Sequence, residues 1–238
     1  MSKKHYIFPI SDIHLGSKNC NLEFLNKWFN EFDKAGSEKS IYLMGDLIEA
    51  PTTRIDAYAV NLTTNEMVER IVELFEPYKE YIRFSVRGNH ENRMQKEFNY
   101  DVAREIASRL GVQYSKNDFF DTVHVGGNKL IVYGLHGVKA SKYPELAMKN
   151  FRIDMADIDS NLYLHAHNHY CEFQSRFYRN NDGGIRKYYA FTGSFLDYGE
   201  SYAHDRGLAP SLPAFMRLAV DKKLHIDAKK YYLDEVMA

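Results

Sequence analysis

Short apolar runs alternate with segments of helical periodicity over the first ninety residues, and this alternation limits the possible folds more than any other feature of the sequence. The apolar runs cover residues 5–10, 41–44 and 81–86. Segments 21–32 and 64–75 lie between them and carry apolar residues at the i, i+3, i+4, i+7 spacing of a helix with one buried stripe. Strand and helix in this order build a largely parallel sheet with loops at the strand ends, so the sequence predicts an α/β protein.

The pattern becomes antiparallel in the second half of the chain. Pairs of strand-like segments flank turn signals at 126–128, 180–184 and 221–223. We expect one domain over residues 1–238, with core motifs within 12–169 and hairpins at 172–232 that complete a second sheet. The simplest packing is a two-sheet sandwich with flanking helices.

Composition and charge narrow the class of protein. A chain of 238 residues with 45% apolar residues can bury one substantial core. Its 31 basic residues nearly cancel its 32 acidic ones, so it lacks the strong overall positive field that steers many proteins to nucleic acid. Attraction of nucleic acid would therefore require a local basic patch. Two cysteines are too few for a disulfide scaffold. With neither a secretory segment nor a membrane span in the sequence, we expect a cytoplasmic protein without membrane contacts.

Five short segments place metal-competent side chains directly after apolar runs. They are Asp12-Ile13-His14, Gly45-Asp46-Leu47-Ile48-Glu49, Gly88-Asn89-His90-Glu91, Gly134-Leu135-His136-Gly137 and Ala166-His167-Asn168-His169. Side chains two residues apart share a face of an extended chain, so Asp12 and His14 can reach one ion. Oxygen and nitrogen donors without thiolate favour manganese, iron or zinc in an open catalytic site. Two ions roughly 3.5–4 Å apart need a shared ligand, and the two oxygens of Asp46 suit that bridge.

Each signal also has a purely structural explanation. Asp-x-His is common as a cap or a surface pair, and Gly-Asp or Gly-Asn after a strand is common in turns. His136 has the setting of a satisfied core histidine. The ordered set of five segments is more specific than its parts, because each follows a predicted strand and supplies a different donor. The sequence therefore favours a metal centre.

The five segments resemble the signature blocks of the calcineurin-like metallophosphoesterase superfamily and cover the chain from Asp12 to His169. The resemblance implies a four-layer αββα sandwich, with two mixed sheets flanked by helices, and two divalent metal ions at the sheet ends. It also implies two ligand sets, which are Asp12, His14, Asp46 and His169 for one ion, and Asp46, Asn89, His136 and His167 for the other. We expect manganese, with iron or zinc as alternatives.

The resemblance further implies a hydrolase of phosphate esters. Two cations lower the pKa of a bound water and neutralise phosphate oxygens, which leaves the departing alkoxide in need of a proton. A histidine titrates in the right range to donate it, and we assign this role to His90.

Two further residues are candidates for the reaction. Glu49 would raise the pKa of His90 if the two side chains meet, whereas an ordinary solvated glutamate fits the sequence equally well. Arg93 is a candidate for holding the substrate phosphate, and pairing with a neighbouring acid is the alternative.

The last segment departs from the superfamily pattern. The superfamily usually has glycine before the first histidine of this pair, whereas this chain has Ala166 and an extra histidine, His165. A register in which His165 and His167 bind metal is therefore an alternative. We favour His167 and His169, because Ala166 is the nearest small substitute, and assign His165 to packing.

The metal ligands alone do not select a substrate, since the superfamily includes protein phosphatases, nucleotide phosphodiesterases, lipid-precursor pyrophosphohydrolases and DNA repair nucleases. Residues 176–179 and 186–189 interleave basic and aromatic side chains on one predicted hairpin, a composition typical of surfaces that stack bases and hold phosphates. Inward packing of the aromatic rings explains the same pattern. Our hypothesis is a phosphodiesterase or nuclease that acts on DNA. The alternatives are a small-molecule phosphatase or nucleotide (pyro)phosphohydrolase, and a non-catalytic binding protein, against which the complete ligand set counts.

Overall fold

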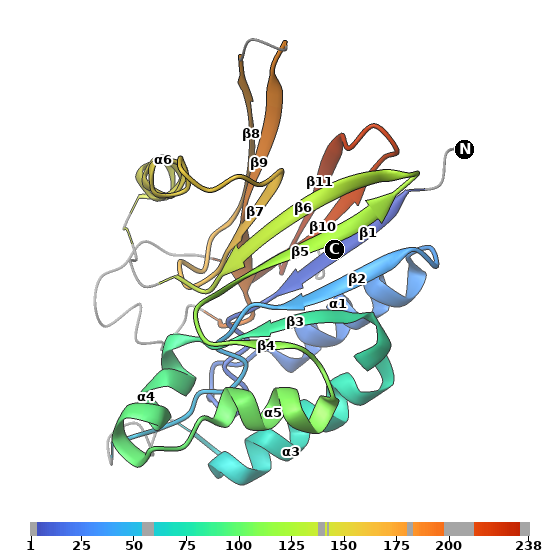
Figure 1. Cartoon of the computed structure of the whole chain (residues 1–238). Coiled ribbons are helices and arrows are strands. Elements are labelled where there is room, and N and C mark those ends of the chain that lie inside the picture. Colours follow the sequence, from blue (N-terminus) through green and yellow to red (C-terminus); the bar gives the residue numbers. More distant parts are fainter. Residues whose placement is uncertain are drawn as a thin grey trace.

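The computed structural model describes residues 4–53, 60–137, 141, 143–179, 183–197 and 212–233. Its strands form one continuous sheet that folds over into two layers (Figure 1). The first layer contains four parallel strands, β1 (His5–Ile10), β2 (Lys39–Leu43), β3 (Ile82–Val86) and β4 (Tyr114–Ser115), in the order β4-β3-β2-β1. This is the parallel sheet predicted from the alternating apolar runs.

The second layer is mixed. It contains β5 (Asp118–Val125), β6 (Asn128–Leu135), β7 (Leu162–His165), β8 (Cys171–Tyr178) and β9 (Ile185–Ser194). β6, β7 and β9 are parallel, while β5 and β8 pair antiparallel with β6 and β9.

The last hairpin joins the two layers. Its strands are β10 (Ala214–Val220) and β11 (Ile226–Tyr232). We expected this hairpin to complete the second sheet, but β10 runs antiparallel beside β1 and meets β9 only at its first two residues. The pairing has a physical reason, because β2 occupies one edge of β1 and the other buried edge needs partners for its backbone groups.

Five α-helices and one 3₁₀ helix accompany the sheet. They are α1 (Leu22–Lys34), α3 (Thr64–Phe75), the 3₁₀ helix η1 (Glu76–Tyr81), α4 (Asn89–Phe98), α5 (Val102–Leu110) and α6 (Pro144–Asp154) among the described residues. The Asn21 side chain accepts a hydrogen bond of 2.8 Å from Phe24 N and starts α1 as the sequence predicts. Thr63 and Glu66 form a capping box at the start of α3, one residue before the predicted boundary.

Three apolar cores lie between successive layers. Phe8 and Ile10 of β1 pack with α1, α3 and α5, while Ile7 points to the second layer. On β7, Leu162 faces the first layer and Tyr163 faces α6. Figure 1 shows α1, α3 and α5 on one outer side and α6 on the other. Alternate strand residues thus supply a core on each face, and the predicted four-layer αββα architecture is confirmed.

Aromatic stacking fixes the inner contact between the two strand layers. The Phe119 ring of β5 stacks on Tyr42 of β2 and Phe84 of β3, with centroid distances of 5.2 and 4.7 Å. Such pairs contribute about 0.5–1.5 kcal/mol beyond the burial of their surface.

No helix in the described parts of the chain combines the length and apolarity required to cross a bilayer.

Candidate metal centre

The metal-competent side chains converge at one end of the two strand layers. They follow β1 (Asp12, His14), β2 (Asp46, Glu49), β3 at the start of α4 (Asn89, His90), β6 (His136) and β7 (His167, His169). The carboxyl ends of the parallel strands meet there, which is where α/β sheets commonly bind ligands. All seven predicted ligands lie in this region.

The backbone at the site is not extended, contrary to our expectation for the Asp-x-His pattern. Asp12, His14, Asp46, His167 and His169 have φ values of 50, 49, 51, 66 and 58°. Left-handed backbone at residues other than glycine costs on the order of 1–3 kcal/mol each and persists only where its surroundings enforce it. The side chains therefore converge through tight turns rather than by sharing one face of a strand.

Parallel loops hold the first two turns in this conformation. The backbone N–H of Asp12 donates to Gly45 O and that of His14 to Asp46 O, each at 3.0 Å. Gly88 packs so closely against this pair of loops that a Cβ atom there would collide with the Asp46 carboxylate. A glycine at this position lets the start of α4 approach Asp46.

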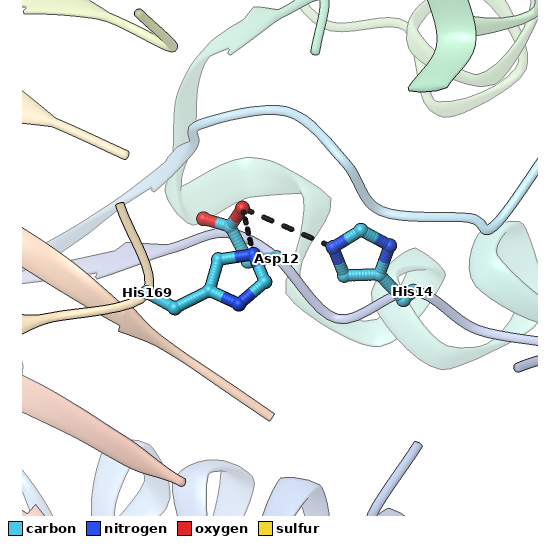
Figure 2. A group of neighbouring side chains, drawn as sticks. All are labelled: Asp12, His14 and His169. Carbon is cyan, nitrogen blue, oxygen red and sulfur yellow. Dashed lines mark ion pairs between the residues drawn. The ribbon is translucent and has the colours of Figure 1, made fainter. Parts of the chain in front are cut away.

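The first group of candidate ligands surrounds Asp12 (Figure 2). Asp12 Oδ1 lies 3.3 Å from His169 Nε2 and 3.9 Å from His14 Nε2. Ligand atoms roughly 2.0–2.2 Å from a tetrahedral ion are about 3.4 Å apart, so these spacings suit three ligands of one ion. The donors come from both strand layers.

The second group surrounds Asp46. Its Oδ2 atom lies 3.3 Å from His136 Nε2, and Asn89 Oδ1 lies 2.9 Å from His136 Nε2 and 2.6 Å from His167 Nδ1. The same Asp46 oxygen is 3.9 Å from His14 Nε2 of the first group. Asp46 is therefore within reach of both groups.

The histidine hydrogen bonds fit a metal site. His14 Nδ1 lies 2.9 Å from Glu49 Oε2, and His136 Nδ1 lies 2.8 Å from the carbonyl oxygen of Met44. An acceptor at Nδ1 keeps the hydrogen there and turns a bare Nε2 toward the carboxylates, as in histidines that bind metal. His14 Nε2 is buried and has no hydrogen-bond partner within the described chain. A cation between this atom and the carboxylates would satisfy it.

The electrostatics of the centre also favour a cation. Burial would lower the pKa of His136, but the charge and hydrogen bond of Asp46 and the charge of Asp12 raise it to about 10. Burial would raise the pKa of Asp12, but the hydrogen bond and charge of His169 lower it to about 2. Both shifts show that the carboxylates stabilise positive charge strongly, and a divalent ion would supply that charge.

His90 lies beside both groups and contacts Glu49. Its Nδ1 atom is 2.8 Å from the backbone oxygen and 3.1 Å from the Oε1 atom of Glu49. Burial would lower the pKa of His90, but the charges of Asp46 and Glu49 and the hydrogen bond of Glu49 raise it to about 9. Of the two sequence-based alternatives for Glu49, the structure has the one in which the carboxylate meets the imidazole.

Comparison with known families shows to which family the chain belongs. Residues 6–183 match the sequence model of a family described as calcineurin-like phosphoesterase. The chain belongs to this family. The resemblance inferred from the five segments is thus confirmed, and the metal dependence of calcineurin-like phosphoesterases agrees with the ligand groups.

Solved structures provide more distant comparisons for this calcineurin-like phosphoesterase. Vacuolar Protein Sorting 29 from Cryptosporidium parvum is 13% identical, with a TM-score of 0.45 and coverage of 96% of this chain and 98% of that chain. A predicted phosphoesterase from Streptococcus pneumoniae TIGR4 is 14% identical, with a TM-score of 0.42 and coverage of 98% and 99%. A serine/threonine phosphatase from Saccharomyces cerevisiae is 10% identical, with a TM-score of 0.40 and coverage of 96% and 80%. No curated protein matches the chain.

Glu91 is a site residue whose role the sequence-based prediction missed. This side chain is only 1% exposed, and its carboxylate accepts hydrogen bonds of 2.7–3.4 Å from the backbone N–H groups of Asp46, Leu47, Ile48 and Gly88. Burial and the charge of Asp46 raise the pKa of Glu91 to about 7. A glutamate three residues after the glycine that starts a helix is half of a capping-box signature, and that signal could have drawn attention to it.

The remaining predicted residues of this family member also have defined positions. Arg93 Nη2 lies 4.0 Å from Glu49 Oε1, and 38% of the Arg93 side chain is exposed beside the site. His165 belongs to neither ligand group; its ring packs edge-on against Phe151 and Phe191, and burial lowers its pKa to about 4. The structure thus brings His167 and His169 to the centre and leaves His165 among aromatic rings.

Proposed function

We propose that this chain is a binuclear metal-dependent phosphodiesterase or nuclease that acts on DNA. The observation that carries the proposal is the position of Asp46, whose Oδ2 atom approaches histidines of both ligand groups, His14 at 3.9 Å and His136 at 3.3 Å. A carboxylate in this position suits a shared ligand of two ions.

Each of the two ions would have its own set of ligands, with Asp46 shared between them. Asp12, His14 and His169 would hold one ion, Asn89, His136 and His167 the other, and Asp46 both. When bound, such ions lower the pKa of a coordinated water and neutralise phosphate oxygens. The mixture of carboxylate, imidazole and amide donors favours manganese, with iron or zinc as the alternatives.

His90 would hold the proton for the leaving oxygen. Glu49 fixes its Nδ1 atom through two oxygens, so Nε2 is the atom left to donate to the substrate. Against the effect of burial, the charge of Asp46 and the hydrogen bond and charge of Glu49 raise the pKa of the imidazole and favour its protonated form. The proton would pass from His90 Nε2 to the oxygen of the breaking phosphorus–oxygen bond.

Arg93 is suited to orient the substrate rather than to react. Its Nη2 atom lies 4.0 Å from Glu49 Oε1, and 38% of the side chain is exposed beside the site. A phosphate oxygen at this exposed part would form charge-assisted hydrogen bonds with the guanidinium.

The preference for nucleic acid is supported by the outer part of the β8–β9 hairpin. Figure 1 shows this hairpin extending beyond the other strands. Its side chains Phe177 and Tyr178 are 60% and 43% exposed, and Arg186 lies opposite Phe177 in the pairing. Exposed aromatic rings beside arginines suit base stacking and phosphate contacts. Lys187 does not join them, because it donates to Tyr163 Oη at 2.9 Å.

The substrate class can be tested in one panel. Purified protein with manganese would be given plasmid, linear and single-stranded DNA, RNA, cyclic nucleotides and aryl phosphates, with the His90→Ala variant as the matched control. We expect cleavage of DNA, little phosphate release from monoesters, and much slower cleavage by the variant. Rapid hydrolysis of monoesters without DNA cleavage would instead assign the chain to the small-molecule phosphatases. A complete lack of turnover with manganese, iron and zinc would refute the enzymatic proposal.

A further inference from the structure

A cavity of about 430 Å³ opens directly beside the metal centre. Asn89 and His136 of the second ligand group form one side of it. The opposite sides come from the turn between β4 and β5 and from the C-terminal half of α6. A ligand in this cavity would therefore be next to a phosphate held at the candidate metal ions.

We propose that this cavity binds one nucleotide unit of the substrate, with the nucleoside against its apolar wall and a second phosphate at Lys116. The inference rests on the proposed function, since the metal centre positions the reacting phosphate. The cavity lies beside the metal centre and is lined mainly by residues that are not predicted metal ligands.

The size of the cavity argues for a single organic group. Pockets that bury drug-sized ligands have volumes of about 300–1,000 Å³, and this cavity falls in the lower part of that range. A double helix is far too wide to enter. A free nucleotide or an unpaired nucleotide of a single strand is of the right size, and enzymes that act on single bases commonly draw one nucleotide out of its stack.

The wall near α6 is apolar and rigid. Leu135, Phe151 and Met155 line it. Phe151 is held in place by Phe191, with ring centroids 5.5 Å apart and nearly parallel planes, and by the edge of His165. A preformed apolar wall favours a flat or cyclic group over a flexible, strongly hydrated one.

The opposite rim carries three polar side chains, Lys116, Asn117 and Asn92. None of the three forms a side-chain hydrogen bond or an ion pair with another described residue. The turn that carries Lys116 is anchored beside the metal centre, because Arg87 N donates to Ser115 O at 3.2 Å. A cation and two amides are thus available to a ligand.

The other charged side chains that line the cavity either have a partner in the protein or can accept a hydrogen bond from an uncharged group of the bound nucleotide. Arg87 lies 3.5 Å from Asp101, and Asp118 accepts a hydrogen bond of 2.9 Å from Tyr133 Oη. Asp154 also lines the cavity and can accept from a base amino group or a sugar hydroxyl. Lys116 is therefore the lining cation best placed to hold a second phosphate.

Binding of thymidine 3′-phosphate tests this assignment without metal or turnover. Calorimetric titration of chelator-treated protein should show saturable binding, weaker binding of thymidine, and no comparable binding of inorganic phosphate. Lys116→Ala should weaken thymidine 3′-phosphate binding about three- to tenfold, as expected for loss of one contact from an exposed lysine whose charge is screened by solvent. Lys149→Ala is the matched control, because it removes one lysine from an exposed position on α6 that does not line the cavity. Absence of binding, or equal effects of the two substitutions, would overturn the proposal.

The same titration separates the two sources of such a nucleotide. Tighter binding of a short single-stranded oligothymidylate than of thymidine 3′-phosphate would assign the cavity to a strand, and equal or weaker binding would assign it to a free nucleotide. Hydrolysis of bis(p-nitrophenyl) phosphate, a small diester, by the wild type and by the Lys149→Ala control provides an independent measure of the metal centre. Absence of that activity in the wild type would count against the proposed function, whereas the titration alone decides the cavity.

Discussion

Replacement of Glu91 by alanine should destabilise the protein and weaken metal binding together. The carboxylate of Glu91 accepts four backbone N–H groups, from the loop that carries Asp46 and from Gly88. A net contribution of about 1 kcal/mol for each hydrogen bond gives a loss of about 4 kcal/mol. Water that enters the vacated space would restore part of it, so we expect a decrease of about 3–4 kcal/mol in the free energy of unfolding.

The metal affinity should fall because Asp46 has a left-handed backbone, with φ of 51°, that the hydrogen bonds to Glu91 help to maintain. Residues that orient metal ligands typically change metal affinity by about 10–100-fold when mutated. Urea unfolding of chelator-treated protein and calorimetric titration with manganese would measure the two effects. Glu69→Ala, at an exposed position on α3, is the control and should change neither quantity. A Glu91→Ala protein less than 1 kcal/mol below the wild type, with unchanged manganese affinity, would refute the reasoning.

Four further outcomes follow from the site. His90→Ala should keep its metal content in elemental analysis yet cleave unactivated diesters roughly 10²–10⁴-fold more slowly, with a smaller loss on aryl esters. Asp46→Ala should lose both ions in the same analysis, and a full complement would disprove the bridging role. Glu49→Gln should move the alkaline limb of the pH–rate profile to lower pH, because Glu49 raises the pKa of His90 and activity is lost as pH rises through that pKa. His165→Asn should retain both ions while His169→Asn loses one, and the reverse pattern in elemental analysis would restore the alternative register.

The positions of the site residues were predictable because each follows a strand with a clear apolar signal. Asp12, Asp46 and His136 could be assigned to one edge of the layers from strand order alone, and the structure has them there. Local periodicity and strand-end chemistry carry this information without tertiary detail.

The local geometry was not predictable in the same way. Asp12 and His14 are left-handed, a conformation that is uncommon for residues other than glycine and that hydrogen bonds to the neighbouring loop support here. Asn89 and His90 begin α4 instead of lying in a loop, and the N–H of His90 donates to Asp46 Oδ1 at 2.8 Å. These features depend on contacts between segments far apart in the sequence, and the periodicity of apolar residues gives no information on such contacts.

The topology of the last hairpin was missed for a related reason. Residues of β10 alternate as a buried strand does in either layer, so the pattern alone allows both placements. The choice depends on the open edge of β1, which only the assembled sheet reveals.

Each ligand group draws on both strand layers, with Asp12, His14 and Asp46 from the first and His136, His167 and His169 from the second. Neither layer supplies a complete group. During synthesis, the growing polypeptide therefore cannot assemble either group until the segment after β7 has left the ribosome and reached the loops made more than a hundred residues earlier. A chain that ended before this point would lack part of both ligand groups, so the proposed pair of metal ions would require a chain that has been made and folded past it.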